Sequence, residues 1–156
     1  MNNNTNKTND VLLDYQTKRL QDLIEEIIQC CKKQTSDLSK KFNIPEAELD
    51  CLLLFGDERY LTAKSIAQKL DVVRSRVTKI TTGLIRKGLV ESIEDPKDAR
   101  VKLIGLTQKG QKKSKEVSAI ITDLHRKLLL ELDPKQRKMV LSYLEALRLG
   151  MEVVKK

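Results

Sequence analysis

Apolar residues recur every third or fourth position along much of the chain, which is the spacing of amphipathic helices. The first such stripe runs from Val11 to about Lys41, and the segment Asn43–Pro45 interrupts it. Pro45 suits the first turn of a second helix, which the pattern predicts to run to about Phe55. The first third of the chain therefore predicts one long helix followed by a short one.

The middle of the chain reads as two short helices, a tight turn between them, and then a hairpin. Thr62 is a side-chain cap for the first of these helices. The second helix, Val73–Lys87, has one apolar face and one polar face. Gly88 is placed to end it. The runs Leu89–Ile93 and Val101–Leu106 have strand composition and flank a charged segment, which predicts a β-hairpin with a long charged tip. Together these elements predict a winged helix-turn-helix.

Two further helices complete the chain. Thr107 caps a fifth helix that is expected to stop at Leu132, and Asp133 with Gln136 forms a capping-box start for the last one. The apolar residues of the last helix alternate four and three positions apart, which is typical of a seam for another helix. They are Val140, Leu144, Leu147, Met151 and Val154.

The predicted fold is mostly α with a small β-hairpin wing, an α+β class in which a winged helix-turn-helix is flanked by N- and C-terminal dimerisation helices. Residues 1–10 are Asn- and Thr-rich and are expected to be a disordered tail. Residues 11–44 and 114–156 are expected to be the dimerisation helices. Residues 45–113 are expected to form the DNA-binding region within one intertwined domain.

Composition excludes several classes of protein. The 156 residues are 40% hydrophobic and 33% charged, with no apolar run long enough for a bilayer and no apolar stretch near the start. A cytoplasmic location without a membrane partner, and three reduced cysteines, are therefore expected. One His, no Trp and six Gly supply no plausible nucleophile–base pair, so we expect no enzyme activity, no catalytic residue, no metal site and no cofactor.

The net charge of +8 lies in one segment. Residues 62–113 hold 13 basic and 5 acidic side chains and alone carry +8, whereas residues 1–61 carry −3 and residues 114–156 carry +3. Basic charge concentrated in one segment is what binding to a phosphate backbone requires. A basic face that only keeps the protein soluble, or one that meets an acidic protein partner, remains an alternative.

Double-stranded DNA is the expected partner, because the second helix of the motif has a donor-rich polar face that fits a major groove. The expected recognition-helix contacts are Arg74, Ser75, Arg76, Thr78, Lys79 and Thr82. Arg100 on the wing is expected to enter the minor groove, with Asp98 orienting it through a charge-assisted hydrogen bond. The other expected wing contacts are Lys97 and Lys102, and the expected contacts to the DNA backbone are Thr62 and Lys64.

The segment DPKDARVKLIGLTQKG, residues 95–110, resembles the wing-to-helix pattern of the MarR family of bacterial transcription regulators, which is Asp-x-Arg, a strand, then Leu-Thr-x-x-Gly. The resemblance extends over nearly the whole chain from about Val11. It implies an obligate homodimer with interlocked terminal helices and a palindromic operator. It also implies that Val73–Lys87 is the recognition helix. Val73 departs from the family, where Ser is common at that position.

Gly83 is unusual for another reason. It lies inside the predicted recognition helix, where Gly costs about 1 kcal/mol relative to Ala. Close packing and a slight bend are both possible reasons for a glycine here.

The resemblance also implies a small-molecule effector, often an aromatic or phenolic anion, and most simply a repressor that the ligand releases. Only five aromatic residues are present to line such a pocket: Tyr15, Phe42, Phe55, Tyr60 and Tyr143. The main alternative is a thiol redox regulator that uses Cys30, Cys31 or Cys51, since Lys32 and Lys33 favour a thiolate at an exposed Cys30 or Cys31. Against it, free cysteines are usually small buried hydrophobes. His125 is expected on a helix surface, without a second His for zinc.

Overall fold

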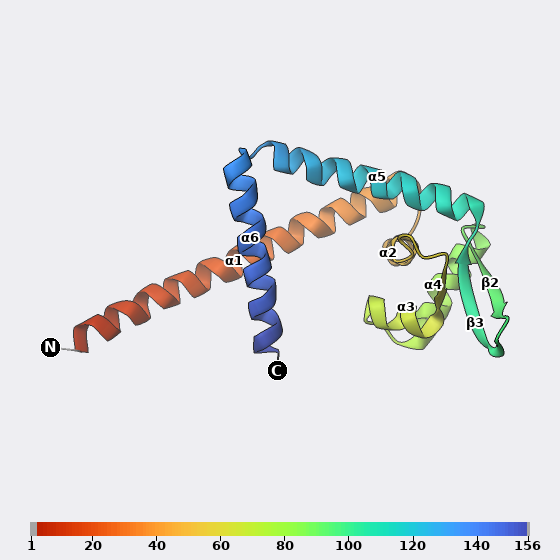
Figure 1. Cartoon of the computed structure of the whole chain (residues 1–156), viewed down its shortest axis with the longest axis horizontal. Coiled ribbons are helices and arrows are strands. Elements are labelled where there is room, and N and C mark those ends of the chain that lie inside the picture. Colours follow the sequence, from red (N-terminus) through yellow and green to blue (C-terminus); the bar gives the residue numbers. More distant parts are fainter. Residues whose placement is uncertain (1–2, 156) are drawn as a thin grey trace.

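The computed structural model describes residues 3–155, and it describes side chains for residues 10–98 and 101–155. Within this part the chain is mostly helical with a small antiparallel sheet (Figure 1). The elements in chain order are α1 (Asn3–Phe42), α2 (Glu46–Leu53), β1 (Tyr60–Thr62), α3 (Ala63–Leu70), α4 (Arg74–Arg86), β2 (Val90–Asp95), β3 (Asp98–Leu106), α5 (Gln108–Leu130) and α6 (Pro134–Val154). The predicted fold class, a winged helix-turn-helix between long terminal helices, is confirmed.

The hairpin β2–β3 carries β1 on its other edge, so the strand order is β1-β3-β2 with antiparallel pairing throughout. The prediction of a long charged tip is wrong. Asp95 pairs with Asp98, which leaves only Pro96 and Lys97 in the turn, and the Lys97 amide donates a 2.8 Å hydrogen bond to the Asp95 carboxylate. Beyond the apolar runs the ladder continues through charged positions, where Glu94 pairs with Lys102 and Asp95 with Asp98.

The hydrophobic core lies inside the winged region rather than between the long helices. Its apolar residues come from α2, α3, α4, the sheet and the first half of α5. The largest fully buried side chains are Phe55, Leu49, Leu52, Ile66, Leu84, Val77, Val90, Val117 and Cys51. Among the described side chains of α1, only those at its C-terminal end pack against this core, through Leu38 and Phe42. The winged region therefore has its own packing, which fixes the relative positions of α3, α4 and the hairpin.

Side-chain caps begin three of the helices, as the sequence predicts. The Thr62 hydroxyl accepts a hydrogen bond from the Ser65 amide at 3.0 Å, and the Thr107 hydroxyl accepts one from the Gly110 amide at 3.0 Å. Asp133 starts α6 with a complete capping box. Gly88 has a φ of 69°, the left-handed conformation expected at the end of α4.

Helix α1 is longer than the sequence pattern predicts. Disorder is expected for residues 1–10, but the backbone is helical from Asn3. Adding a residue to an existing helix costs far less than starting a new one, so the amphipathic segment after Val11 extends its helix into the polar residues before it. At its other end α1 stops at Asn43, whose φ is 52°.

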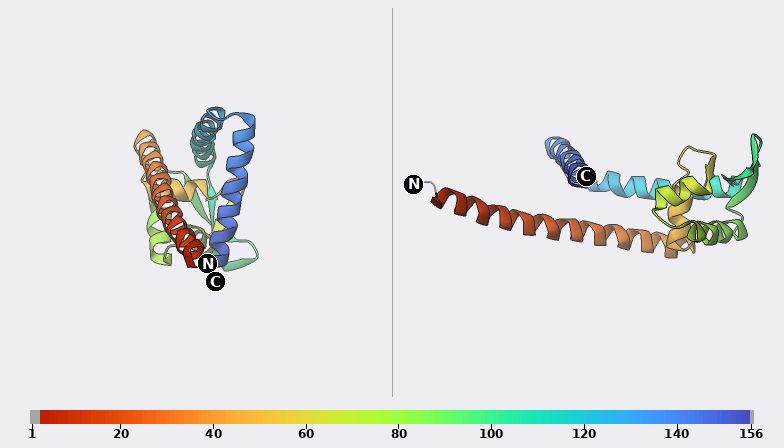
Figure 2. Two further views of the ribbon diagram at one scale, coloured as in Figure 1. Left: turned by 90° about the vertical axis from the view of Figure 1, so that its left-hand side faces the viewer. Right: turned by 90° about the horizontal axis from the view of Figure 1, so that it is seen from below.

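The three long helices project from the winged region. Helix α5 runs away from the hairpin, and α6 turns sharply at the far end of α5 and crosses α1 in the view of Figure 1. The two views of Figure 2 show that α1 and α6, which cross in Figure 1, lie apart from one another. No described residue of α6 is buried, and large apolar side chains stay exposed along both helices. A single chain therefore leaves the apolar stripes of its terminal helices uncovered.

Candidate nucleic-acid interface

Helix α4 is held by its apolar face, which leaves its polar face to solvent. Val77, Ile80 and Leu84 are buried in the core. Val73 occupies the N-cap position with extended backbone, 70% exposed and without a side-chain cap. The six residues that the sequence assigns to the recognition helix are all exposed: Arg74, Ser75, Arg76, Thr78, Lys79 and Thr82.

These exposed residues do not all point the same way. Each residue turns the helix by about 100°, so Ser75, Lys79 and Thr82 share the middle of the outward face. Arg74 and Arg76 lie at its two opposite edges. Side chains in the middle of the outward face therefore point away from the protein, whereas Arg74 and Arg76 point toward the elements on either side of α4.

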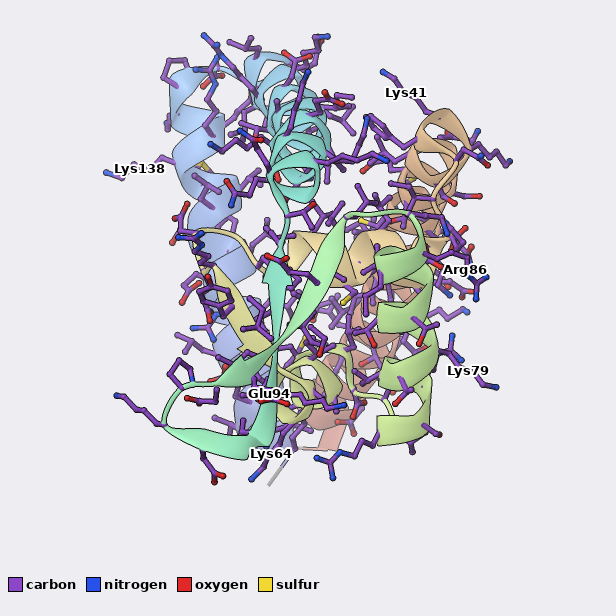
Figure 3. All side chains as sticks on the ribbon, turned by 90° about the vertical axis from the view of Figure 1, so that its right-hand side faces the viewer. Lys41, Lys64, Lys79, Arg86, Glu94 and Lys138 are labelled. Carbon is purple, nitrogen blue, oxygen red and sulfur yellow. The ribbon has the colours of Figure 1, made fainter. Side chains whose placement is uncertain are left out.

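Arg86 also belongs to the outward face, although the sequence analysis does not assign it to the site. It is exposed and lies seven residues, or two turns, after Lys79. Figure 3 shows the Lys79 and Arg86 side chains projecting on the same side of α4. The seven-residue spacing is the signal in the sequence that identifies it.

Each edge of α4 borders a groove. On the Arg76 side, the α2 groove lies between α2 and α4, and its lining consists of Pro45, Ala47, Glu48, Val73, Ser75, Arg76, Lys79 and Ile80. On the Arg74 side, the wing groove lies between the starts of α3 and α4 and strand β3. Its lining consists of Thr62, Ala63, Lys64, Arg74, Val101 and Lys102. The wing groove thus joins residues from all three predicted groups: recognition helix, wing and DNA backbone.

Gly83 allows α2 to pack directly against α4. A Cβ at this position would lie 2.0 Å from the Glu48 Oε1 atom. Glu48 is only 9% exposed, and its Oε2 atom forms a 2.8 Å ion pair with Lys87 Nζ just beyond the end of α4. Close packing, one of the two reasons open at the sequence level, is therefore what this glycine provides.

The wing residues are only partly described. Lys97 in the tip turn and Lys102 on β3 are exposed, and Asp98 at the start of β3 is half-buried. Arg100 lies on β3, but its side chain is outside the described part of the chain, and so is the predicted contact between Arg100 and Asp98.

The cysteines differ sharply in their surroundings. Cys30 and Cys31 are exposed on α1, whereas Cys51 is fully buried in α2. Burial, reinforced by the nearby Glu48 and Asp50 carboxylates, raises the pKa of the Cys51 thiol to about 12. Cys51 is therefore protonated at neutral pH and is not the reactive thiol of a redox sensor.

The remaining predictions concern His125, metal ligands and membrane-spanning helices. His125 is exposed on α5, as expected. Over residues 10–98 and 101–155, no group of three or more His, Cys, Asp or Glu side chains is placed to hold a metal ion. In the same part of the chain, none of the helices is long and apolar enough to cross a membrane.

Comparisons with known proteins agree with the winged architecture. Residues 35–102 match the model of the MarR family. The chain is 28% identical over 101 residues to the transcriptional regulator AdcR of Streptococcus pneumoniae. The alignment covers 62% of this chain and 68% of AdcR.

Two solved structures of MepR from Staphylococcus aureus share the fold. A point mutant of MepR matches with a TM-score of 0.71 and 24% identity, covering 83% of this chain and 96% of MepR. A second MepR mutant, bound to an oligodeoxyribonucleotide, matches with a TM-score of 0.59 and 22% identity, covering 85% of this chain and 97% of MepR.

Proposed function

The chain belongs to the MarR family of winged-helix transcription regulators, and from this premise we propose that it binds a palindromic DNA operator as a homodimer. As a transcription regulator it is not an enzyme. The observation that carries the proposal is the convergence of basic side chains from α3, α4 and the wing on the surface beside the outward face of α4.

The outward face of α4 reads bases in the major groove in this proposal. Ser75, Lys79 and Thr82 occupy the middle of that face, and Arg76 and Thr78 flank it. Hydroxyl, ammonium and guanidinium groups are the donors that fit guanine and thymine edges. The wing enters the neighbouring minor groove through Arg100, with Lys97 beside it and Asp98 orienting the guanidinium.

The uncovered apolar helices support the homodimer. Along α6 the exposed apolar residues include Val140, Leu144 and Met151, members of the seam that the sequence predicts. Exposed apolar surface of this extent marks an interface. A second copy of the chain would cover it, and a twofold axis through the interface would set two winged lobes on half-sites about 10 base pairs apart.

A ligand-responsive repressor is the form of regulation we propose. A pocket lies between α5 and the connection from α2 to β1, where the winged region meets a helix that leads to the dimer interface. Its lining consists of Gly56, Asp57, Glu58, Arg59, Leu106, Gln111, Ser114 and Lys115. These side chains are mainly charged or polar, so the pocket suits a small polar effector better than an aromatic one.

Selection of bound duplexes from random DNA tests the proposal. We expect a palindromic motif and an affinity that falls steeply with salt. Arg76→Ala should relax the preference at one or two positions per half-site, at a cost of about 1–3 kcal/mol if the guanidinium contacts a base edge. Arg100→Ala should weaken operator binding in a protein that stays folded and dimeric.

Two results would count against the proposal. Binding without sequence preference and without steep salt dependence would favour the alternative in which the winged region docks on an acidic protein. Equal affinities of wild type and the Arg100 variant would remove the wing from the interface.

Redox control is a second candidate, because Cys30 and Cys31 are both exposed on α1. Their oxidation would alter the helix that we place at the dimer interface. Peroxide titration of operator binding separates the two candidates: a Cys30→Ser/Cys31→Ser variant that responds like the wild type would exclude thiol sensing.

A further inference from the structure

The wing groove brings together three cations that are far apart in the sequence. Lys64 lies in the first turn of α3, Arg74 in the first turn of α4, and Lys102 on β3. We propose that these three side chains form one clamp for the DNA sugar-phosphate backbone, and that Arg74 contacts phosphate rather than bases. The inference rests on the proposed function, since it requires that the winged region binds duplex DNA.

The position of the groove is the first reason for this assignment. A duplex with α4 in its major groove and the wing in the adjacent minor groove has one backbone strand between those two grooves. That strand must cross the surface that separates α4 from β3. The wing groove is this surface, so a phosphodiester rather than a base edge faces its lining residues.

The orientation of Arg74 is the second reason. Arg74 lies at the edge of the outward face of α4 that borders α3 and the wing, whereas Ser75 and Lys79 point outward from the middle of that face. Its guanidinium is therefore directed along the surface toward Lys64 and Lys102. Guanidinium and ammonium groups both bind phosphate oxygens, and neither needs a particular base to do so.

The charge of the groove is the third reason. Its described lining contains no acidic side chain. Two other lysines of the same region, Lys69 and Lys87, are instead engaged by Glu58 at 2.9 Å and by Glu48 at 2.8 Å. Thr62 adds a hydroxyl at the rim: its oxygen caps α3, and its proton can be donated to a phosphate.

One carboxylate lies next to a lining residue of the groove, and its removal is a test in which binding should become stronger rather than weaker. Glu94 on β2 lies directly across from Lys102 on β3, so the two side chains share a face of the sheet. Figure 3 shows Glu94 and Lys64 at the same end of the molecule, beside the wing. A phosphate held in the groove would be repelled by Glu94, and removal of this charge should strengthen binding.

The decisive measurement is the salt dependence of binding for single variants on an operator selected with the wild-type protein. Lys64→Gln, Arg74→Gln and Lys102→Gln should each lower the slope of log affinity against log salt by about 1. Each should also weaken binding by the same factor on the operator and on operators with one changed base pair. Lys69→Gln is the matched control on α3, and its slope should equal that of the wild type.

Glu94→Gln should raise affinity on every sequence, and Arg74→Lys should restore most of the affinity and the slope that Arg74→Gln loses. Circular dichroism of each variant establishes that it is folded. If Arg74→Gln is unfolded, the test of Arg74 rests on the Arg74→Lys variant alone. A salt slope equal to that of the wild type, together with an unchanged base preference, then supports the clamp.

Two outcomes would overturn the inference. An unchanged slope together with an altered base preference in Arg74→Gln would make Arg74 a base reader, while the proposed function stands. Unchanged slopes in all three Gln variants would mean that the backbone does not cross the wing groove. Absence of any DNA binding by the wild type is the separate result that removes the proposed function, and the clamp with it.

Discussion

Two glycines in helices of the winged region lie so close to neighbouring atoms that an alanine methyl group would clash with them. At Gly83 the obstacle is the end of the Glu48 side chain. At Gly110 it is backbone, because a Cβ would lie 1.8 Å from the Leu89 carbonyl oxygen. That carbonyl is already fixed by a 3.1 Å hydrogen bond from the Thr107 amide. The Leu-Thr-x-x-Gly pattern thus closes α5 tightly onto the end of α4 and the start of β2.

Gly110→Ala should therefore lower the free energy of unfolding by about 1–3 kcal/mol, because backbone must move to admit the methyl group. Thermal unfolding followed by circular dichroism, at one protein concentration, measures the change. Gly150→Ala in α6 is the control: its methyl group meets no atom of its own chain within 4 Å, so it should stabilise the protein by up to about 1 kcal/mol. A Gly110 variant as stable as the wild type would contradict this reading of the motif.

Cys51 gives a pH dependence of stability with a definite sign. In the unfolded chain its thiol ionises near the ordinary pKa of 9.0, whereas burial raises the pKa to about 12 in the folded protein. The stabilising contribution is complete below pH 9 and is lost as the pH rises from about 9 to 12, since the unfolded state binds fewer protons there. The loss approaches about 1.4 kcal/mol per pH unit. Urea unfolding at pH 8 and pH 10 should show a larger decrease for the wild type than for Cys51→Ala, and equal decreases would refute it.

At the scale of elements, the Glu48 side chain adds a polar contact to the apolar packing of α2 against α4. Glu48 of α2 packs against Gly83 in the body of α4 and pairs with Lys87 just beyond its end. Because α2 follows α1 after a short connection, this contact links the long N-terminal helix to the helix that we assign to base reading. The orientation of α4 thus depends on the position of α2.

A double-mutant cycle tests this link. Gly83→Ala should destabilise the wild type, since the methyl group displaces the Glu48 carboxylate. In a Glu48→Ala background the same change should stabilise the protein by about 1 kcal/mol, the helix preference of Ala over Gly. We expect a coupling of about 1–3 kcal/mol from chemical unfolding of the four proteins. Additive effects of the two changes would show that the helices do not communicate through this contact.

At the scale of the whole molecule, the chain has one packed region and two unpacked helices. The core belongs to the winged region, while α1 exposes large apolar residues between Val11 and Ile28 and α6 exposes them between Met139 and Val154. Folding of a single chain therefore stabilises the proposed DNA-binding surface, and association would stabilise the terminal helices. In the proposed homodimer, this division makes the spacing of the two winged lobes depend on the dimer interface.

Leu144→Glu should disrupt the dimer, because it would bury an unpaired carboxylate in the proposed seam of α6. A cost of about 3 kcal/mol or more corresponds to a dissociation constant raised about 100-fold or more. Analytical ultracentrifugation over a range of concentrations measures it. Ser142→Glu, on the other face of α6, is the matched control and should leave the dimer intact. A Leu144 variant that remains fully dimeric would place the interface elsewhere.

The sequence by itself determined the six helices of residues 3–155, the wing hairpin and most helix ends, but not strand β1. Thr62, Thr107 and Asp133 cap helices through contacts within three residues, and the apolar spacing assigns the buried face of α4. Such features are encoded locally, so a pattern of neighbouring residues is enough to predict them. The same holds for the exposure of the six residues assigned to the recognition helix.

Only the tertiary structure decided which residues from separate parts of the chain become neighbours. It placed Glu48 against Gly83, reduced the wing tip to Pro96 and Lys97, and brought Arg74 and Lys102 to one groove. These partners are separated along the chain, and their approach depends on how whole elements pack or pair. Helical spacing establishes that Arg74 is exposed, but only the packing of β3 and α3 beside α4 determines what Arg74 faces.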